Sequence, residues 1–238
     1  MTMQFSADAA PFIATSRDIL FSQGIDLTFG TDFEEYKEIV ADERPMQKLG
    51  APFDPEINEL NKNNAFWVIG RSEDGALIHT QASKRIRLSG RPLSSYMMRQ
   101  FRAFPPPLPG VNLTTSRFRA TPGTHRIAGT AAYHGEFWVA PERGRYRGVG
   151  LAPVFGRTGM LEMMRRWDPD WIYGFILNVV AYKGFGARIG YLHLEPSVLK
   201  WVVDGRTAPI DTFLAYNSRE DLQYLLDIPL DDVVPEAA

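Results

Sequence analysis

The sequence predicts a mixed α/β domain in which helices flank a central sheet. In the second half of the chain, strand-like and helix-like segments follow in the order strand, loop, helix, strand, helix and a pair of strands. The 238 residues are 45% hydrophobic and 23% charged, which is typical of a globular protein with a sizeable core. No internal repeat or linker divides the chain, so we expect one domain over residues 1–238.

The first half carries clear signals after residue 24 and weak ones before it. Thr31-Asp32-Phe33-Glu34 has the pattern of a capping box, and apolar side chains recur on one helical face after it. Asp54-Pro55 resembles a helix cap followed by a first-turn proline. The expected elements are a strand at 25–30, helices at 32–43 and from 54 to about 61, strands at 65–69 and 76–88, and a helix at 94–104.

The stretch from about 90 to 124 is longer than a plain connection between elements should be. It contains five arginines and the run Pro105-Pro106-Pro107. We expect it to be an insertion that covers one end of a site.

The second half begins with what we expect to be the central strand. Residues 171–177 are apolar without alternation, as expected for a strand that is buried on both faces. Asp168-Pro169 ends the preceding helix, and Ser218 has the character of a helix cap. The expected elements are strands at 126–140, 171–177, 192–194, 198–203 and 210–216, and helices at 150–167, 178–189 and 218–227.

Charge is distributed unevenly along the chain. The net charge is −2, yet residues 81–166 hold fifteen Lys and Arg against three Asp and Glu, a local net of +12. Such segregation indicates an anionic partner, and a polyphosphate cofactor or an acidic carrier protein fits at least as well as nucleic acid. The absence of cysteine excludes thiol catalysis and cysteine-ligated metals, and we expect no metal site. Without a signal peptide or a membrane-spanning run, a cytoplasmic location is expected.

The stretch from His134 to Gly150 has the layout of a phosphate-binding site. A strand stops at Pro141, a loop with three arginines and three glycines follows, and an amphipathic helix begins at Gly150. A helix N-terminus offers unpaired N–H groups and partial positive charge, and glycines let the backbone approach the ligand closely.

Four motifs in this order resemble the GNAT superfamily of acyltransferases. They are Trp138-Val139-Ala140-Pro141-Glu142, Arg145-x-x-Gly148-x-Gly150, Asn178-x-x-Ala181 and Arg188-Ile189-Gly190-Tyr191. The resemblance covers about residues 65–88 and 126–216. It leaves an N-terminal extension, about 1–60, and the insertion at 90–124 without counterparts. It implies a mostly antiparallel central sheet flanked by helices, with a pyrophosphate loop between a central strand and a helix.

The resemblance also implies that acetyl-CoA or another acyl-CoA is the cosubstrate. The pyrophosphate would be held by backbone amides of residues 145–150 and by arginine side chains, and the pantetheine arm by the end of the central strand. The cofactor-binding residues implied are Trp138, Val139, Arg143, Arg145, Tyr146, Arg147, Gly148, Val149, Gly150 and Asn178.

His134 and Glu136 are the candidates for the general base that deprotonates an incoming amine. Two apart on one strand, they are expected to face the same side. The alternatives are that one of them pairs with an arginine of the insertion, or that neither is the base. The family often has a tyrosine as the acid that protonates the leaving thiolate, but Gly186 stands at that position. Tyr182, one helical turn earlier, is the candidate substitute, and the alternative is that no acid is used.

Together these observations predict an N-acyltransferase, most simply an N-acetyltransferase, acting by direct attack in a ternary complex with an amine. Two alternatives stay open. A longer acyl chain could be delivered by coenzyme A or by acyl carrier protein, or the chain could be a coenzyme A-binding sensor whose chemistry has lapsed. The acceptor and the oligomeric state, monomer or homodimer, cannot be read from the sequence, and no membrane or nucleic-acid partner is expected.

Reversing the charge of the loop tests the cofactor assignment. Arg145→Glu should weaken acetyl-CoA binding far more than it lowers the unfolding free energy, because a negative charge would face the pyrophosphate. Calorimetric titration and urea unfolding of the variant and the wild type measure the two effects. Full retention of coenzyme A affinity would contradict the assignment.

Overall fold

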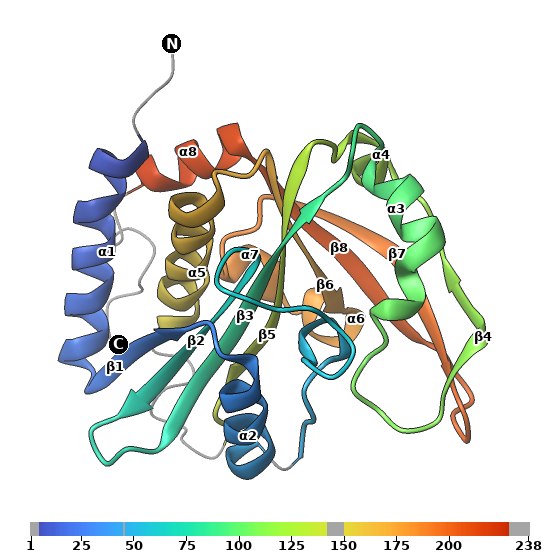
Figure 1. Cartoon of the computed structure of the whole chain (residues 1–238), viewed down its shortest axis with the longest axis horizontal. Coiled ribbons are helices and arrows are strands. Elements are labelled where there is room, and N and C mark those ends of the chain that lie inside the picture. The colour runs from blue at the N-terminus through green and yellow to red at the C-terminus, as the bar shows by residue number, and fades with distance from the viewer. Residues whose placement is uncertain (1–4, 45, 142–149, 229–238) are drawn as a thin grey trace.

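One sheet of eight strands runs through the protein, in the order β1-β2-β3-β5-β6-β8-β7-β4 (Figure 1). The computed structural model describes residues 5–44, 46–141 and 150–228. All neighbouring strands are antiparallel except β5 and β6, which are parallel. The predicted class, a mixed and mostly antiparallel sheet flanked by helices, is confirmed.

The first half supplies the strands at both edges of the sheet and helices on both of its faces. Its elements are α1 (Phe5–Ser22), β1 (Ile25–Gly30), α2 (Phe33–Glu43), η1 (Ala51–Phe53), β2 (Ala65–Ser72), β3 (Leu77–Arg87), α3 (Leu93–Gln100), η2 (Phe101–Ala103) and β4 (Val111–Phe118). The Asp32 carboxylate caps α2 by accepting the backbone N–H groups of Glu34 and Glu35.

The second half supplies the centre of the sheet. Its elements are α4 (Pro122–Arg126), β5 (Thr130–Val139), α5 (Leu151–Trp167), β6 (Trp171–Leu177), α6 (Asn178–Ala181), α7 (Phe185–Arg188), β7 (His193–Val203), β8 (Ile210–Ser218) and α8 (Arg219–Asp227). Ser218 caps α8 as predicted, because its hydroxyl accepts the Asp221 N–H.

Several boundaries predicted from the sequence are wrong. Residues 5–22, which gave only weak signals, form a helix, and the helix expected from residue 54 is replaced by the short η1 before it. The central strand starts at Thr130 rather than 126, because Pro122–Arg126 forms α4.

Three further differences concern where predicted elements break, join or end. The helix expected at 178–189 is broken into α6 and α7 by Gly184, whose φ of +76° is left-handed. The two strands expected at 192–194 and 198–203 are one strand, β7, whose pairing with β8 shifts register between Glu195 and Leu199. The helix expected at 94–104 ends at Gln100 and continues as the 3-10 turn η2.

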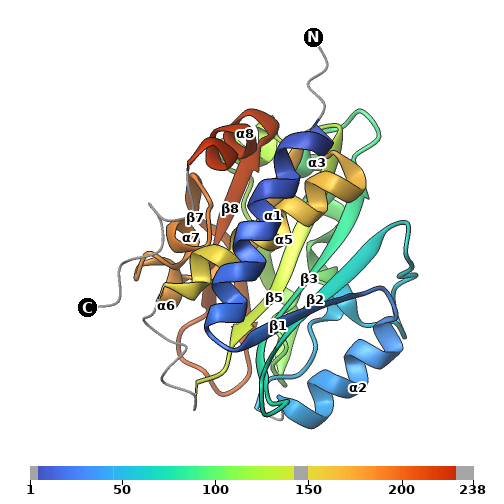
Figure 2. The ribbon, with the colours of Figure 1, turned by 90° about the vertical axis from the view of Figure 1, so that its left-hand side faces the viewer.

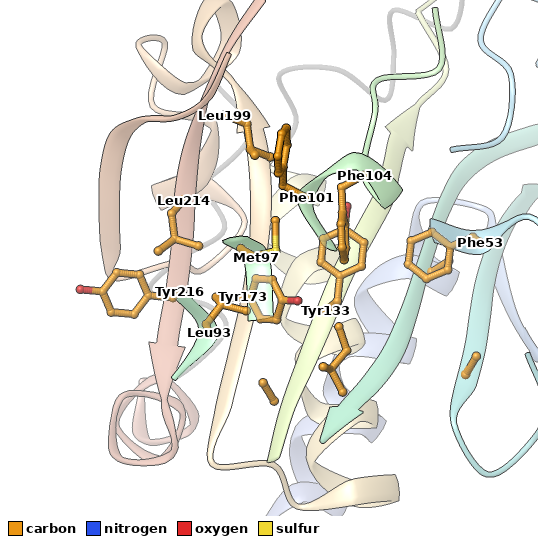
Figure 3. Close-up of a cluster of buried hydrophobic side chains, with 14 of the residues drawn as sticks. Phe53, Leu93, Met97, Phe101, Phe104, Tyr133, Tyr173, Leu199, Leu214 and Tyr216 are labelled. Carbon is orange, nitrogen blue, oxygen red and sulfur yellow. The ribbon is translucent and has the colours of Figure 1, made fainter. Parts of the chain in front are cut away.

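Each face of the sheet has its own hydrophobic core. Helices α1, α5 and α8 cover one face, whereas α2, η1 and α3 cover the other (Figures 1 and 2). Successive residues of β2 show the alternation: Phe66 and Val68 belong to the first core, and Trp67 and Ile69 to the second. The second core is rich in aromatic side chains, including Phe53, Phe104 and Tyr133 (Figure 3).

The sheet opens at its centre. Strands β5 and β6 pair only over Ala131–Tyr133 and Trp171–Tyr173, although both strands continue past these residues. Beyond Tyr133, the β6-facing edge of β5 therefore has no pairing strand in the described part of the chain. Among the described residues, no helix is long and apolar enough to cross a membrane.

Candidate active site

A cavity of about 910 Å³ occupies the space where β5 and β6 separate. The segments 133–139 of β5 and 174–177 of β6 form its walls, and the start of α5 at 150–153 closes one side. Phe104 and Pro105-Pro106-Pro107, from the predicted insertion, also line it. The cavity reaches residues of both cores, so it passes through the sheet from one face to the other.

A β-bulge in β5 forms the centre of this cavity. Thr80 of β3 lies opposite Trp138 and Ala82 lies opposite Gly135, so Gln81 faces the two residues Glu136 and Phe137. Glu136 has the left-handed φ of +55°, which is strained for a residue with a side chain.

The bulge overturns the expectation that His134 and Glu136 face the same side of the strand. The extra residue breaks the alternation of side chains. His134 points toward the α5 face, where its ring lies 6.0 Å from that of Phe137. Glu136 points toward the α2 face, where its carboxylate meets Arg44 and Gly50.

Glu136 is held by an ion pair that the N-terminal extension supplies. Its Oε2 lies 3.2 Å from Nη2 of Arg44, and its Oε1 accepts the Gly50 N–H at 2.9 Å. Arg44 also donates to the Thr80 hydroxyl at 2.7 Å, and that hydroxyl donates to the Glu136 carbonyl at 3.0 Å. Burial raises the pKa of Glu136, and Arg44 opposes the shift. The partner of Glu136 is thus Arg44 and not an arginine of the insertion.

His134 belongs to a buried hydrogen-bond chain. The Gln81 side chain donates to the Phe155 carbonyl through its amide nitrogen, so its oxygen faces Nε2 of His134 at 2.8 Å. Nε2 must therefore carry the proton, and Nδ1 accepts the hydroxyl of Tyr191 at 3.1 Å. Burial lowers the pKa of His134 from 6.5 to about 4, because the imidazolium would be poorly solvated there.

Tyr182 is not among the residues that line the cavity. Its side chain is 77% exposed and packs edge-on against Phe213. Tyr191, three residues beyond Arg188, is buried and lines the cavity instead. Burial raises the pKa of Tyr191 well above its usual value, which keeps the hydroxyl protonated.

The residues expected to bind the cofactor are only partly covered by the structure. Arg143, Arg145, Tyr146, Arg147, Gly148 and Val149 lie outside the described residues. Trp138, Val139 and Gly150 line the cavity, whereas Asn178, which begins α6, is not among its lining residues. Lys183 and Arg188, which the motifs did not single out for binding, line it and add positive charge.

Arg44, Gly50, Gln81 and Tyr191 are the site residues that the sequence reasoning missed. His79-Thr80-Gln81 was a usable signal, because three consecutive polar residues in a predicted strand place polar side chains on both faces of the sheet, where a buried polar group needs a hydrogen-bond partner. Nothing in the sequence points to Arg44, which follows a surface helix and meets Glu136 only in the folded chain. In the described ranges, no three His, Asp or Glu side chains gather closely enough to hold a metal ion.

Solved structures of several N-acetyltransferases resemble this chain. Arabidopsis thaliana NAA60 in complex with a bisubstrate analogue matches at 14% identity and a TM-score of 0.44, over 81% of this chain and 98% of its own. The spermidine N-acetyltransferase of Vibrio cholerae, in complex with CoA and spermine, matches at 10% identity and a TM-score of 0.46, over 84% and 99%. The ribosomal-protein-S5-alanine acetyltransferase of Vibrio fischeri matches at 13% and 0.45, over 84% and 95%.

No protein-family model and no curated protein matches the sequence. At such low identity and TM-score, the solved structures carry no argument about what this chain binds. The function proposed below rests on the chain's own residues and geometry.

The buried histidines predict how stability depends on pH. Burial lowers the pKa of His79 to about 3 and that of His134 to about 4, whereas both titrate near 6.5 when unfolded. The stability that the neutral histidines contribute is fully present above pH 6.5. It is lost as the pH falls toward 4, because the unfolded chain then binds more protons than the folded one. For each histidine, the unfolding free energy should fall by about 1.4 kcal/mol for each unit by which the pH is lowered in this window.

Urea unfolding between pH 7 and 5 measures this dependence. His134→Gln can keep hydrogen bonds to Gln81 and Tyr191 but does not titrate. The slope of its unfolding free energy against pH should therefore be shallower than that of the wild type by the contribution of one histidine. Comparing the two proteins isolates His134 from groups such as Glu136, whose raised pKa acts in the opposite direction. Identical slopes would contradict the burial of a neutral His134.

The Arg44–Glu136 pair predicts strong coupling between the two positions. Arg44→Met should cost about 3–5 kcal/mol of unfolding free energy, because it leaves a buried carboxylate without its counter-ion. Adding Glu136→Gln to the Arg44→Met variant should restore at least about 1 kcal/mol of the lost unfolding free energy. Arg71→Met is the matched control: it breaks the more exposed Arg71–Glu43 pair and should cost no more than about 1 kcal/mol. Urea unfolding of Arg44→Met, Glu136→Gln, the double variant and Arg71→Met gives these values, and additive effects at 44 and 136 would contradict the coupling.

Proposed function

We propose that this protein is an acyl-CoA-dependent N-acyltransferase that moves an acyl group from coenzyme A to an amine. The observation that carries the proposal is the cavity between β5 and β6, which begins at the N-terminus of α5 and runs past a bulged, unpaired strand edge. A thioester arm can lie along such an edge, because the backbone groups of β5 that β6 leaves free can hydrogen-bond with its amides.

The phosphate groups of the cofactor would lie at the start of α5. Gly150 has a φ of +75° and precedes the first turn of this seventeen-residue helix, whose N-terminus favours anions. The loop with Arg143, Arg145 and Arg147 leads into it along the chain. Lys183 and Arg188 line the same cavity and supply further positive charge for a polyphosphate.

The transfer would be a direct attack within a ternary complex. The amine nitrogen forms a bond to the thioester carbon, the C–S bond breaks, and one proton passes from nitrogen to sulfur. Fixed backbone N–H groups at the bulge of β5 are suited to stabilise the negative charge that develops on the carbonyl oxygen.

We assign the proton transfer to Tyr191 rather than to Tyr182. Once the Tyr191 hydroxyl turns away from Nδ1 of His134, it can give its proton to the departing sulfur and take the proton of the newly acylated nitrogen, which balances the step. His134 would act through Tyr191 as a positioning residue, because both of its ring nitrogens are engaged inside the core. Glu136 is paired with Arg44 and we propose that it maintains the bulge.

Tyrosine-to-phenylalanine variants test this assignment. Tyr191→Phe should lower kcat about 10²-fold or more, in the range of a lost general acid. Tyr182→Phe, the matched control at an exposed position, should change it less than twofold. The assay is release of coenzyme A thiol from acetyl-CoA with a panel of amines, and the protein adds no thiol of its own because it lacks cysteine. A large effect of Tyr182→Phe with none at Tyr191 would reverse the assignment.

A further inference from the structure

The part of the cavity on the α2 face is lined mainly by apolar side chains, and we call it the apolar chamber. Its walls are Phe53, Phe104, Tyr133, Phe175, Leu199 and Trp201, all of which pack in the second core. Figure 3 labels four of them, Phe53, Phe104, Tyr133 and Leu199. Aromatic rings meet face to face and edge to face there: Phe53 stacks on Tyr133 at 5.5 Å, and Phe104 meets Tyr133 edge-on at 5.0 Å.

Two polar groups that border the chamber, those of Thr212 and Glu136, already have partners within the protein. Thr212 donates its hydroxyl to the Leu199 carbonyl at 3.4 Å and accepts the Leu199 N–H at 3.2 Å. The Glu136 carboxylate is taken by Arg44 and by the Gly50 N–H. A polar occupant would need placed donors and acceptors to orient it, whereas a saturated chain needs only apolar contact.

The chamber also lies where an acyl chain would continue. In the proposed function the thioester sits at the bulge of β5, with the phosphates toward α5. The cavity runs from the start of α5 on one face, past Glu136, to Trp201 on the other. An acetyl group carries one carbon beyond its carbonyl and would not extend to these walls.

From this arrangement we propose that the chamber holds the apolar acyl chain of the donor, so that the preferred donor carries a chain longer than acetyl. This inference rests on the proposed function, since it places the thioester at the bulge. Each methylene buried in the chamber should tighten binding by up to about fourfold until the chamber is full. Phe104 and the three prolines after it would cover the chain, which gives the 90–124 segment a role in selecting the donor.

The test is calorimetric titration of the full chain with coenzyme A and with its acetyl, butanoyl, hexanoyl and octanoyl esters. Coenzyme A and acetyl-CoA should bind within about threefold of each other. Octanoyl-CoA should bind at least about thirtyfold more tightly than acetyl-CoA. Equal affinities across the series would overturn the proposal.

Two chamber variants and one control identify where the chain binds. Phe175→Ala removes a half-buried wall and should weaken octanoyl-CoA binding at least about fivefold, with acetyl-CoA unchanged. Leu199→Trp fills the chamber and should bring octanoyl-CoA to the affinity of acetyl-CoA. Phe213→Ala is the matched control: Phe213 is a half-buried phenylalanine on neighbouring β8 that packs against Tyr182 outside the chamber, and its loss should change neither affinity.

A preference for octanoyl-CoA that survives both chamber variants would also overturn the proposal, because the chain would then bind elsewhere. Failure of coenzyme A and of every ester to bind is a different result. It would contradict the proposed function itself and not only the chamber.

Discussion

The short parallel pairing of β5 and β6 is the constraint on which the site depends. The two strands pair through only three residues each and then separate, in a sheet whose other neighbours are antiparallel. Helices cover both faces of the sheet, and the hydrophobic core on each face closes one side of the opening. The sheet therefore tolerates the separation of the two strands. The opening provides a cavity through the sheet and an edge of β5 that β6 does not pair beyond Tyr133.

The bulge at Glu136 is the second requirement, and a distant part of the chain maintains it. A non-glycine residue with a left-handed backbone conformation costs free energy, so contacts with surrounding residues must hold Glu136 in place within β5. Arg44 and Gly50 bond its carboxylate, and Thr80 bonds its carbonyl. Residues 44 and 50, far from β5 in the sequence, therefore contribute directly to the geometry of the site.

Much of the fold was predictable because strong local signals agreed with the tertiary structure. The apolar run at 171–177 and the cap at Ser218 predicted β6 and α8 correctly. The division of the site between two faces was not predictable, because one extra residue in β5 reverses the direction of Glu136 relative to His134. Tyr182 was chosen by helical spacing, but Gly184 breaks that helix, and Tyr191 lines the cavity instead.

A crystal structure of the protein with coenzyme A is the most direct test of the proposed binding site. We expect the pantetheine arm to lie between β5 and β6, with its sulfur beside the bulge at Glu136 and Phe137 and its diphosphate at the start of α5. Coenzyme A bound outside this cavity, or a crystal grown with saturating coenzyme A in which the cavity stays empty, would contradict it.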